Sequence, residues 1–212
     1  MRLRFLPPAL TLALAAAPAS ACSLAGPYRI PNNLQLAERA DTILLGTVER
    51  QEGGPPGDTF VIVRPTVLLK GRALPDEVRL SGGLAGPGEP VTRSDPREIS
   101  RPNPDVTLGA CNRDAFLPGM QLVLFLARDR KGVLQPYVPP FARAAEDVPS
   151  ADALWVKAVR LYAEASLLPA RARRAFLAGR RAAALAAGDP ESRLLAADID
   201  RQLKGKEPSL LP

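Results

Sequence analysis

Two cysteines, Cys22 and Cys111, are the side chains with the most distinctive chemistry, because the 212-residue chain contains no histidine. Without histidine, a Ser-His-Asp or Cys-His mechanism is excluded, and so is a conventional zinc site within the chain. The 22 Asp and Glu residues are scattered, and no pair stands out as a general acid and base. The sequence therefore predicts no enzyme activity, no cofactor and no metal held by the chain itself.

Cys22 directly follows a segment with the features of a secretory signal peptide. Residues 1–21 have a basic start with Arg2 and Arg4, a short apolar core and the small-residue sequence Ala19-Ser20-Ala21. The apolar core is shorter than the roughly 20 residues that cross a bilayer. We therefore expect an exported chain that begins at Cys22. The Ala-, Arg- and Pro-rich composition suggests a bacterial source, and hence a periplasmic or secreted protein.

Cys22 has two alternative fates. In an oxidising compartment, two thiols predict one disulfide between Cys22 and Cys111. However, Ala19-Ser20-Ala21-Cys22 also resembles a lipobox, with Ala19 where leucine is usual. An acylated Cys22 would have no thiol for a disulfide and would anchor the protein to the outer membrane. We therefore expect contact with a membrane only if Cys22 is lipidated.

The charge of the chain is mildly basic and predicts no nucleic-acid partner. Residues 22–212 hold 26 basic and 22 acidic side chains, a balance of +4. Basic and aromatic residues are not interleaved as nucleic-acid binding would require. A basic stretch from Arg171 to Arg181 predicts the solvated face of a helix, and contact with anionic lipid or an acidic partner is the alternative.

The middle of the chain predicts β-structure. Five apolar or alternating runs, separated by Gly- and Pro-rich turns, indicate strands at 42–49, 59–69, 77–80, 120–127 and 133–138. No helix long enough for a parallel crossover lies between them, so the sheet is expected to be antiparallel and closed. Residues 81–110 form a long Gly-, Pro- and Ser-rich loop that is expected to be functional or mobile.

Helices are expected on both sides of the strands. A short helix before the first strand is capped by Asn32 or Asn33 and runs to Ala40. At Val148 the composition becomes Ala-, Leu- and Arg-rich, which predicts two or three C-terminal helices. The first of these helices is expected to begin with Ser150 or Asp152 as its N-cap and to end at Pro169. The second is expected to stop at Gly188, and Asp189-Pro190 is expected to start a third. The expected divisions are a signal peptide at 1–21, a β-domain at 22–147, helices at 148–205 and a tail at 206–212.

Several segments together resemble one known family. They are Cys22-Ser23, residues 40–48, residues 67–71, Cys111 with Phe116, and residues 119–125. In this order they resemble the tissue-inhibitor-of-metalloproteinase-like, or netrin-like, OB-fold family and its bacterial members, over about residues 22–140. The resemblance implies a five-stranded OB-type barrel whose first cysteine is disulfide-bonded. The C-terminal helices lie outside the resemblance.

The resemblance also implies a binding role for the N-terminus. In the inhibitor members, the α-amine and carbonyl of the first cysteine bind the zinc of a metalloprotease, and the next side chain enters its specificity pocket. Cys22 and Ser23 occupy these positions here, whereas Leu24 stands where the inhibitors have a second cysteine. We therefore expect an exported, non-enzymatic module that binds a protein partner. A metalloprotease inhibitor acting through Cys22 and an envelope lipoprotein acylated on Cys22 are the alternatives.

Overall fold

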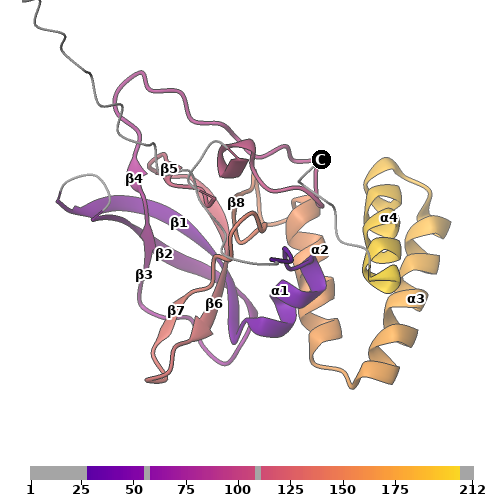
Figure 1. Ribbon diagram of the computed structural model, residues 1–212. Coiled ribbons are helices and arrows are strands. Elements are labelled where there is room, and N and C mark those ends of the chain that lie inside the picture. Colours follow the sequence, from indigo (N-terminus) through magenta and orange to yellow (C-terminus); the bar gives the residue numbers. More distant parts are fainter. Residues whose placement is uncertain (1–27, 55–57, 108–110, 206–212) are drawn as a thin grey trace, which may run out of the picture.

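An antiparallel sheet followed by three helices forms the body of the protein (Figure 1). The computed structural model describes residues 28–54, 58–107 and 111–205. The strands of the main sheet are β1 (Thr42–Gly53), β2 (Thr59–Lys70), β3 (Val78–Ser81), β6 (Gln121–Arg128), β7 (Leu134–Pro136) and β8 (Ala145–Asp147). Their order is β3-β2-β1-β6-β7, and β8 also pairs with β6. All five predicted strands are confirmed.

The sixth strand, β8, was not predicted from the sequence. It pairs antiparallel with β6 through Leu122 and Asp147, Val123 and Glu146, and Leu124 and Ala145. Two of its three residues are carboxylates, and all three are buried. A three-residue segment with two acidic side chains has neither the length nor the apolar alternation that indicates a strand.

The long strands β1 and β2 bend where the sequence places Gly46 and Pro65. These two residues pair with each other, and a register shift lies between Leu45 and Gly46. A side chain at Gly46 would meet Val63 Cγ1 at 2.6 Å, so glycine permits the close approach of the strands. β2 pairs with β3 only from Phe60 to Val63, so Pro65 needs no partner on that side.

The hydrogen-bonded path ends at β3 on one side and at β7 on the other. Among the described residues, no ladder joins these two strands. They nevertheless lie next to each other, and a gap of about 170 Å³ between them is lined by residues that include Val78, Arg79, Leu134 and Pro136. The sheet is therefore strongly curled, and a closing ladder is not part of the described structure.

The segment predicted as one long loop contains two short elements, and a third follows it. These are β4 (Gly83–Leu84), a 3-10 helix (Pro104–Thr107), and, just after the loop, β5 (Ala115–Phe116). β4 and β5 form a two-stranded parallel pair, an exception to the predicted antiparallel arrangement. Burial of Ser94, Ile99, Asn103 and Val106 shows that the loop packs against the rest of the protein.

The N-terminal helix α1 (Asn33–Arg39) begins as the sequence predicts. The side chain of Asn32 accepts a hydrogen bond from Gln35 N, and Gln35 Oε1 accepts one from Asn32 N. This reciprocal pair is a capping box, and it settles the choice between Asn32 and Asn33 in favour of Asn32. Asn33 is instead buried and donates to groups outside the helix.

The C-terminal segment contains three helices: α2 (Leu154–Ser166), α3 (Ala170–Ala187) and α4 (Pro190–Lys204). Gly188 ends α3 with a φ of 73°, and Asp189 caps α4 through Ser192 N, both as predicted. The predicted cap of α2 is wrong. Ala153 occupies that position without a side-chain hydrogen bond, and Ser150 Oγ accepts from Asp152 N within the preceding turn.

α1 and α2 cover one face of the sheet, and α3 and α4 lie outside them (Figure 1). One hydrophobic cluster joins Ile43, Val123 and Phe125 of the sheet to Trp155 and Tyr162 of α2. A second cluster fills the concave side of the sheet and includes Val63, Leu80, Phe116 and Leu124. The helices and the sheet therefore share the first of these two clusters. No helix in the described part of the chain is long and apolar enough to cross a membrane.

Candidate functional site

The predicted site residues Cys22 and Ser23 lie outside the described residues. The disulfide and the inhibitory ridge therefore stay predictions. Cys111, the other predicted site residue, is buried, with 2% of its surface exposed. No free cysteine is present in the described part of the chain. Cys111 has a φ of 60°, a left-handed conformation that is uncommon for a residue with a side chain.

The start of the described chain lies close to Cys111. Tyr28 donates a hydrogen bond from its hydroxyl to Pro140 O at 2.9 Å. The next residue, Phe141, donates from its backbone N to Cys111 O at 2.8 Å, and it too has a φ of 60°. These two contacts place Tyr28 beside the segment that holds Cys111. Tyr28 is six positions after Cys22 in the sequence, and a chain of this length spans at most about 20 Å when extended.

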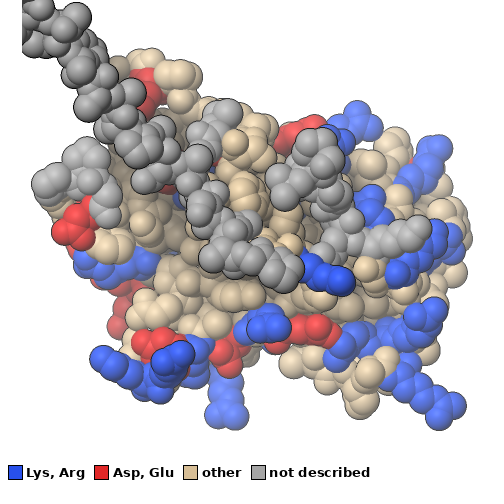
Figure 2. Space-filling view, viewed as in Figure 1, with Lys and Arg blue, Asp and Glu red and all other residues tan. Residues whose placement is uncertain are grey.

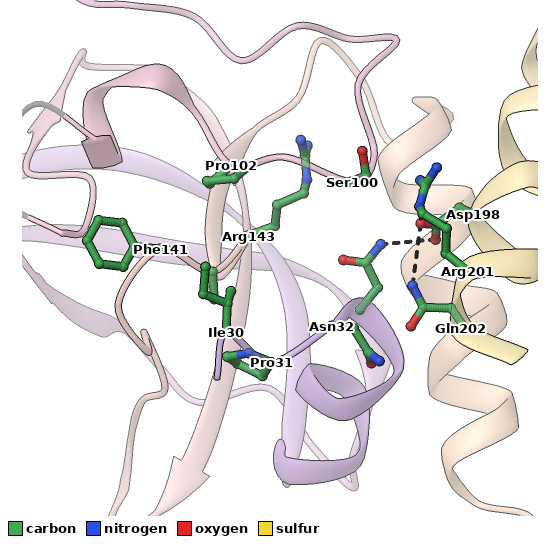
Figure 3. A pocket seen from close by; sticks show the side chains of 12 residues that line it. Ile30, Pro31, Asn32, Ser100, Pro102, Phe141, Arg143, Asp198, Arg201 and Gln202 are labelled. Carbon is green, nitrogen blue, oxygen red and sulfur yellow. Dashed lines mark hydrogen bonds and ion pairs between the residues drawn. The ribbon is translucent and has the colours of Figure 1, made fainter. Parts of the chain in front are cut away.

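A small cavity lies where the N-terminal segment, the loop and α4 meet (Figure 3). Its volume is about 20 Å³, which is room for roughly one water molecule. The lining includes Ile30 and Asn33 of the N-terminal segment, Ser100 of the loop and Asp198 of α4, and the β7–β8 connection adds Phe141 and Arg143. A cavity of this size cannot hold an organic ligand.

Asp198 of α4 is the buried charge at this junction. Its carboxylate accepts hydrogen bonds from Tyr162 Oη at 2.5 Å and from Asn33 Nδ2 at 3.0 Å. Arg201 donates to its other oxygen at 2.8 Å. Burial beside this carboxylate raises the pKa of the Tyr162 hydroxyl well above its usual value. Asp198 thus joins α1, α2 and α4.

A second buried ionic cluster attaches the long loop to β8. Arg113 donates to Asp147 Oδ1 at 2.5 Å, and Ser94 N donates to the same oxygen at 2.8 Å. Arg113 also donates to Thr92 O at 2.9 Å. Burial acts to raise the pKa of Asp147, but the Arg113 guanidinium and Ser94 outweigh it, so the pKa lies below its usual value. The Asp147 carboxylate is therefore ionised at neutral pH, and its role is structural.

Glu146, the other carboxylate of β8, is also held by the loop. Its oxygens accept from Ser94 Oγ at 2.6 Å and from Asn103 N at 2.9 Å. Arg143 lies 3.5 Å from the same carboxylate and donates to Arg101 O. The Arg143 guanidinium stacks 4.5 Å above the Trp155 ring. This contact connects the ionic cluster to the hydrophobic core under α2.

A wider hollow of about 470 Å³ opens over this cluster. Arg93, Asp95, Glu98 and Arg101 of the loop line it, together with Arg143 and Glu146. The first four belong to the long loop that the sequence predicts to be functional or mobile. The basic and acidic side chains are balanced and largely paired with each other, as in Arg101 with Glu98 and Arg93 with Asp147. The lining therefore shows no preference for a charged ligand of one sign.

The chemistry of these groups is that of structural anchors. The three buried carboxylates already accept hydrogen bonds from arginine, serine, tyrosine or amide donors, so none is open to take a proton from a substrate. No cluster of three or more His, Cys, Asp or Glu residues within the described segments could hold a metal ion. The sequence reasoning missed Arg113, Arg143 and Asp198, and the only available signal was the dense charge in Arg143–Asp147.

A scan of protein-family models finds no match to this chain, and a search of curated proteins finds none either. The netrin-like resemblance therefore stays a proposal.

Proposed function

We propose that this chain is an exported, non-enzymatic binding protein of the OB-barrel type, with an N-terminal edge that contacts a protein partner. The edge is formed by Cys22 and Ser23 and is held by a Cys22–Cys111 disulfide. The observation that carries this proposal is the placement of Tyr28 beside Pro140, Phe141 and Cys111. This placement supports the proposed disulfide, because Cys22 precedes Tyr28 by six positions and an extended chain of that length spans at most about 20 Å.

The curled sheet supports the barrel assignment. β1 pairs with β2 on one side and β6 on the other, and its register shifts let it serve both halves of the curl. β3 and β7 approach each other at the seam, where an OB-type barrel would close. β8 adds a sixth strand outside the five of the proposed barrel.

A staple at the N-terminus would favour binding by reducing flexibility. A disulfide that closes a loop of about 90 residues is worth about 4–5 kcal/mol in the chain-entropy model. It would also fix the terminal residues in one conformation before they meet a partner, which lowers the entropic cost of association. Cys111 is buried and its carbonyl accepts a hydrogen bond from Phe141 N, so the staple would be attached to a packed part of the protein.

The mass and thiol content of the protein isolated from its host test this proposal. We expect a chain that begins at Cys22 and has no free thiol. A mass increased by acyl chains, with one free thiol at Cys111, would contradict it and favour the envelope lipoprotein. Cleavage at another residue would remove the proposed edge altogether.

Inhibition of a metalloprotease is the specific form of binding that the Cys22-Ser23 start favours. Titration of zinc endopeptidases with the mature protein measures it. A matched variant with one additional alanine before Cys22 has no α-amine in the chelating position, so inhibition should disappear. Inhibition that survives this extension rules out chelation through the Cys22 amine.

A further inference from the structure

Four turns gather at one end of the molecule, the lower edge in Figure 1. Lys70 pairs with Ile43, and Thr42 pairs with Leu126, so β1 starts where β2 and β6 end. Lys70 Nζ donates to the carbonyl oxygens of Ala37 and Ala40 at 2.6 and 2.7 Å, which places the end of α1 there as well. We name this end the turn face; it comprises residues 38–41, 70–76, 128–133 and 167–173.

The helical tail contributes to the turn face through a direct ion pair. Arg173, at the start of α3, pairs with Glu38 at the end of α1. Arg173 also donates to Ala165 O and Leu168 O, the last carbonyl groups of the α2 region. The α2–α3 turn is thereby fixed beside the turns of the sheet.

The turn face carries the net charge of the described protein. The described residues include 25 basic and 21 acidic side chains, of which eight and four lie on the turn face. The remaining 17 basic and 17 acidic side chains cancel. Figure 2 shows several Lys and Arg side chains projecting from this lower edge. Its exposed cations include Arg39, Arg72, Arg130, Lys131 and Arg171.

Large apolar side chains project from three of the same turns. Leu167 is 73% exposed, Val133 is 49% exposed and Leu74 is 38% exposed. In the described chain, the other exposed large hydrophobic residues are Tyr28, at 36%, and Leu185, at 49%. Each of the three lies at a turn next to cations, rather than in one continuous apolar patch.

We propose that the turn face docks on an anionic phospholipid surface, with Leu74, Val133 and Leu167 entering the headgroup region and the surrounding cations contacting phosphates. Two of the acidic side chains on the turn face accept hydrogen bonds from backbone N–H groups of the turns. Asp129 Oδ1 accepts from Lys131 N at 2.8 Å and from Val133 N at 2.9 Å, and Asp41 Oδ2 accepts from Arg128 N at 2.8 Å. These bonds keep the two carboxylates against the turn backbone, whereas the exposed cations extend into the solvent.

A lipid surface fits this arrangement better than an acidic protein does. A protein interface usually has a contiguous, well-packed apolar core. Here the apolar side chains are separated and stand at the tips of turns, a pattern that a fluid interface can accommodate one side chain at a time. Cations near such a surface each add attraction to anionic lipid. The inference does not depend on the fate of Cys22 or on the proposed protein partner.

Binding to vesicles of phosphatidylcholine, with and without phosphatidylglycerol, tests the charge requirement. We expect the protein to sediment with the anionic vesicles and to be released by salt. Reversal of Arg72 and Lys131 to glutamate should reduce binding at least about twentyfold, given roughly fivefold per cation. The matched control reverses Arg97 and Arg193, which are exposed cations outside the turn face. This pair changes the net charge equally and should leave most of the binding intact.

A fluorescence measurement separates docking through the turn face from anchoring through the N-terminus. Leu167→Trp places an exposed indole at the α2–α3 turn, whereas the native Trp155 is buried and gives a constant background. Leu185→Trp is the control, because position 185 lies about 22 Å along α3 from its first residue, Ala170. Brominated anionic lipid should quench the new indole at position 167 and not at position 185.

Equal quenching at both positions would overturn the proposal, and so would an equal loss of vesicle binding in both charge-reversal pairs. Binding that is the same with and without phosphatidylglycerol would overturn it too. The assignment to lipid is also wrong if the protein never binds vesicles but binds an acidic protein, and reversal of Arg72 and Lys131 abolishes that binding. An acylated Cys22 would hold all variants on the membrane, but it would not distinguish position 167 from position 185.

Discussion

Replacement of Arg113 with methionine tests whether the buried ion pair with Asp147 anchors the long loop. The two side chains are 1% and 8% exposed, and their closest atoms are 2.5 Å apart. Methionine retains much of the length of arginine but removes its charge and its bonds to Asp147, Thr92 O and Ala115 O. Asp147 would keep only Ser94 N and Arg93 as donors.

The expected cost is large because a buried carboxylate would lose its principal counter-ion. Removal of one partner from a buried pair typically lowers the free energy of unfolding by about 3–5 kcal/mol. Arg93→Met is the matched control, because Arg93 contacts the same carboxylate at 3.4 Å but is 56% exposed. Exposed pairs contribute about 1 kcal/mol or less. The double variant Arg113→Met with Asp147→Leu should recover most of the loss, since it leaves no unpaired charge.

The pH dependence gives an independent check on the same pair. The pKa of Asp147 is lower in the folded protein than its usual value, with burial opposing the shift and Arg113 and Ser94 producing it. The stabilisation is therefore complete above the unfolded pKa of about 3.9 and is lost as the pH falls through the lower folded pKa. The difference in the free energy of unfolding between wild type and Arg113→Met should be largest at neutral pH and should shrink below about pH 4.

Urea unfolding followed by fluorescence of Trp155, the only tryptophan, measures these free energies. The anchoring role is refuted if Arg113→Met and Arg93→Met destabilise the protein equally at neutral pH. It is also refuted if the deficit of Arg113→Met grows as the pH falls, because protonation of Asp147 should remove the unpaired charge.

Three further predictions concern packing and covalent structure. Gly46→Ala should lower the free energy of unfolding by about 1–3 kcal/mol in urea titrations, because its Cβ would meet strand β2 at 2.6 Å. Gly54→Ala, with open space around it, should change little. Tyr162→Phe should cost about 1–3 kcal/mol by the same measurement, since Asp198 would lose a buried donor. Cys111→Ser should lower the melting temperature in calorimetry, with a loss of about 2–5 kcal/mol, and reductant should then have no further effect; a melting temperature unchanged by the substitution would contradict the staple.

The sequence predicts elements well where local signals are strong. α3 lies between Pro169 and Gly188, the two residues predicted to interrupt the C-terminal helices, and Asp189 with Pro190 starts α4. The strands β1, β2 and β6 are long and apolar, so their periodicity is clear. In each case, a few neighbouring residues determine the outcome.

The ionic clusters were not predictable by the same reasoning. Arg113, Ser94 and Asp147 are separated by tens of residues, and only the folded chain brings them together. Charged residues are ordinarily expected at the surface. The sequence accordingly indicates a polar loop and a short acidic segment, whereas the structure buries the acidic strand β8 and a few residues of the loop, such as Ser94 and Asn103. The predicted N-cap of α2 is wrong for a related reason. Burial of Leu154 and Trp155 fixes the start of the helix without a capping hydrogen bond.

Side-chain contacts of the short helix α1 bear on both proposals for function. Asp198 of α4 holds Asn33, and Asn33 also donates to Ile99 O in the loop at 2.7 Å. Arg173 of α3 pairs with Glu38 at the other end of α1. The short helix α1 is thus attached at its start to the loop and α4, and at its end to the turn face. Since Asp198 and Arg173 both belong to the helical tail, we expect removal of the tail to loosen α1 together with its contacts to the loop and the turn face.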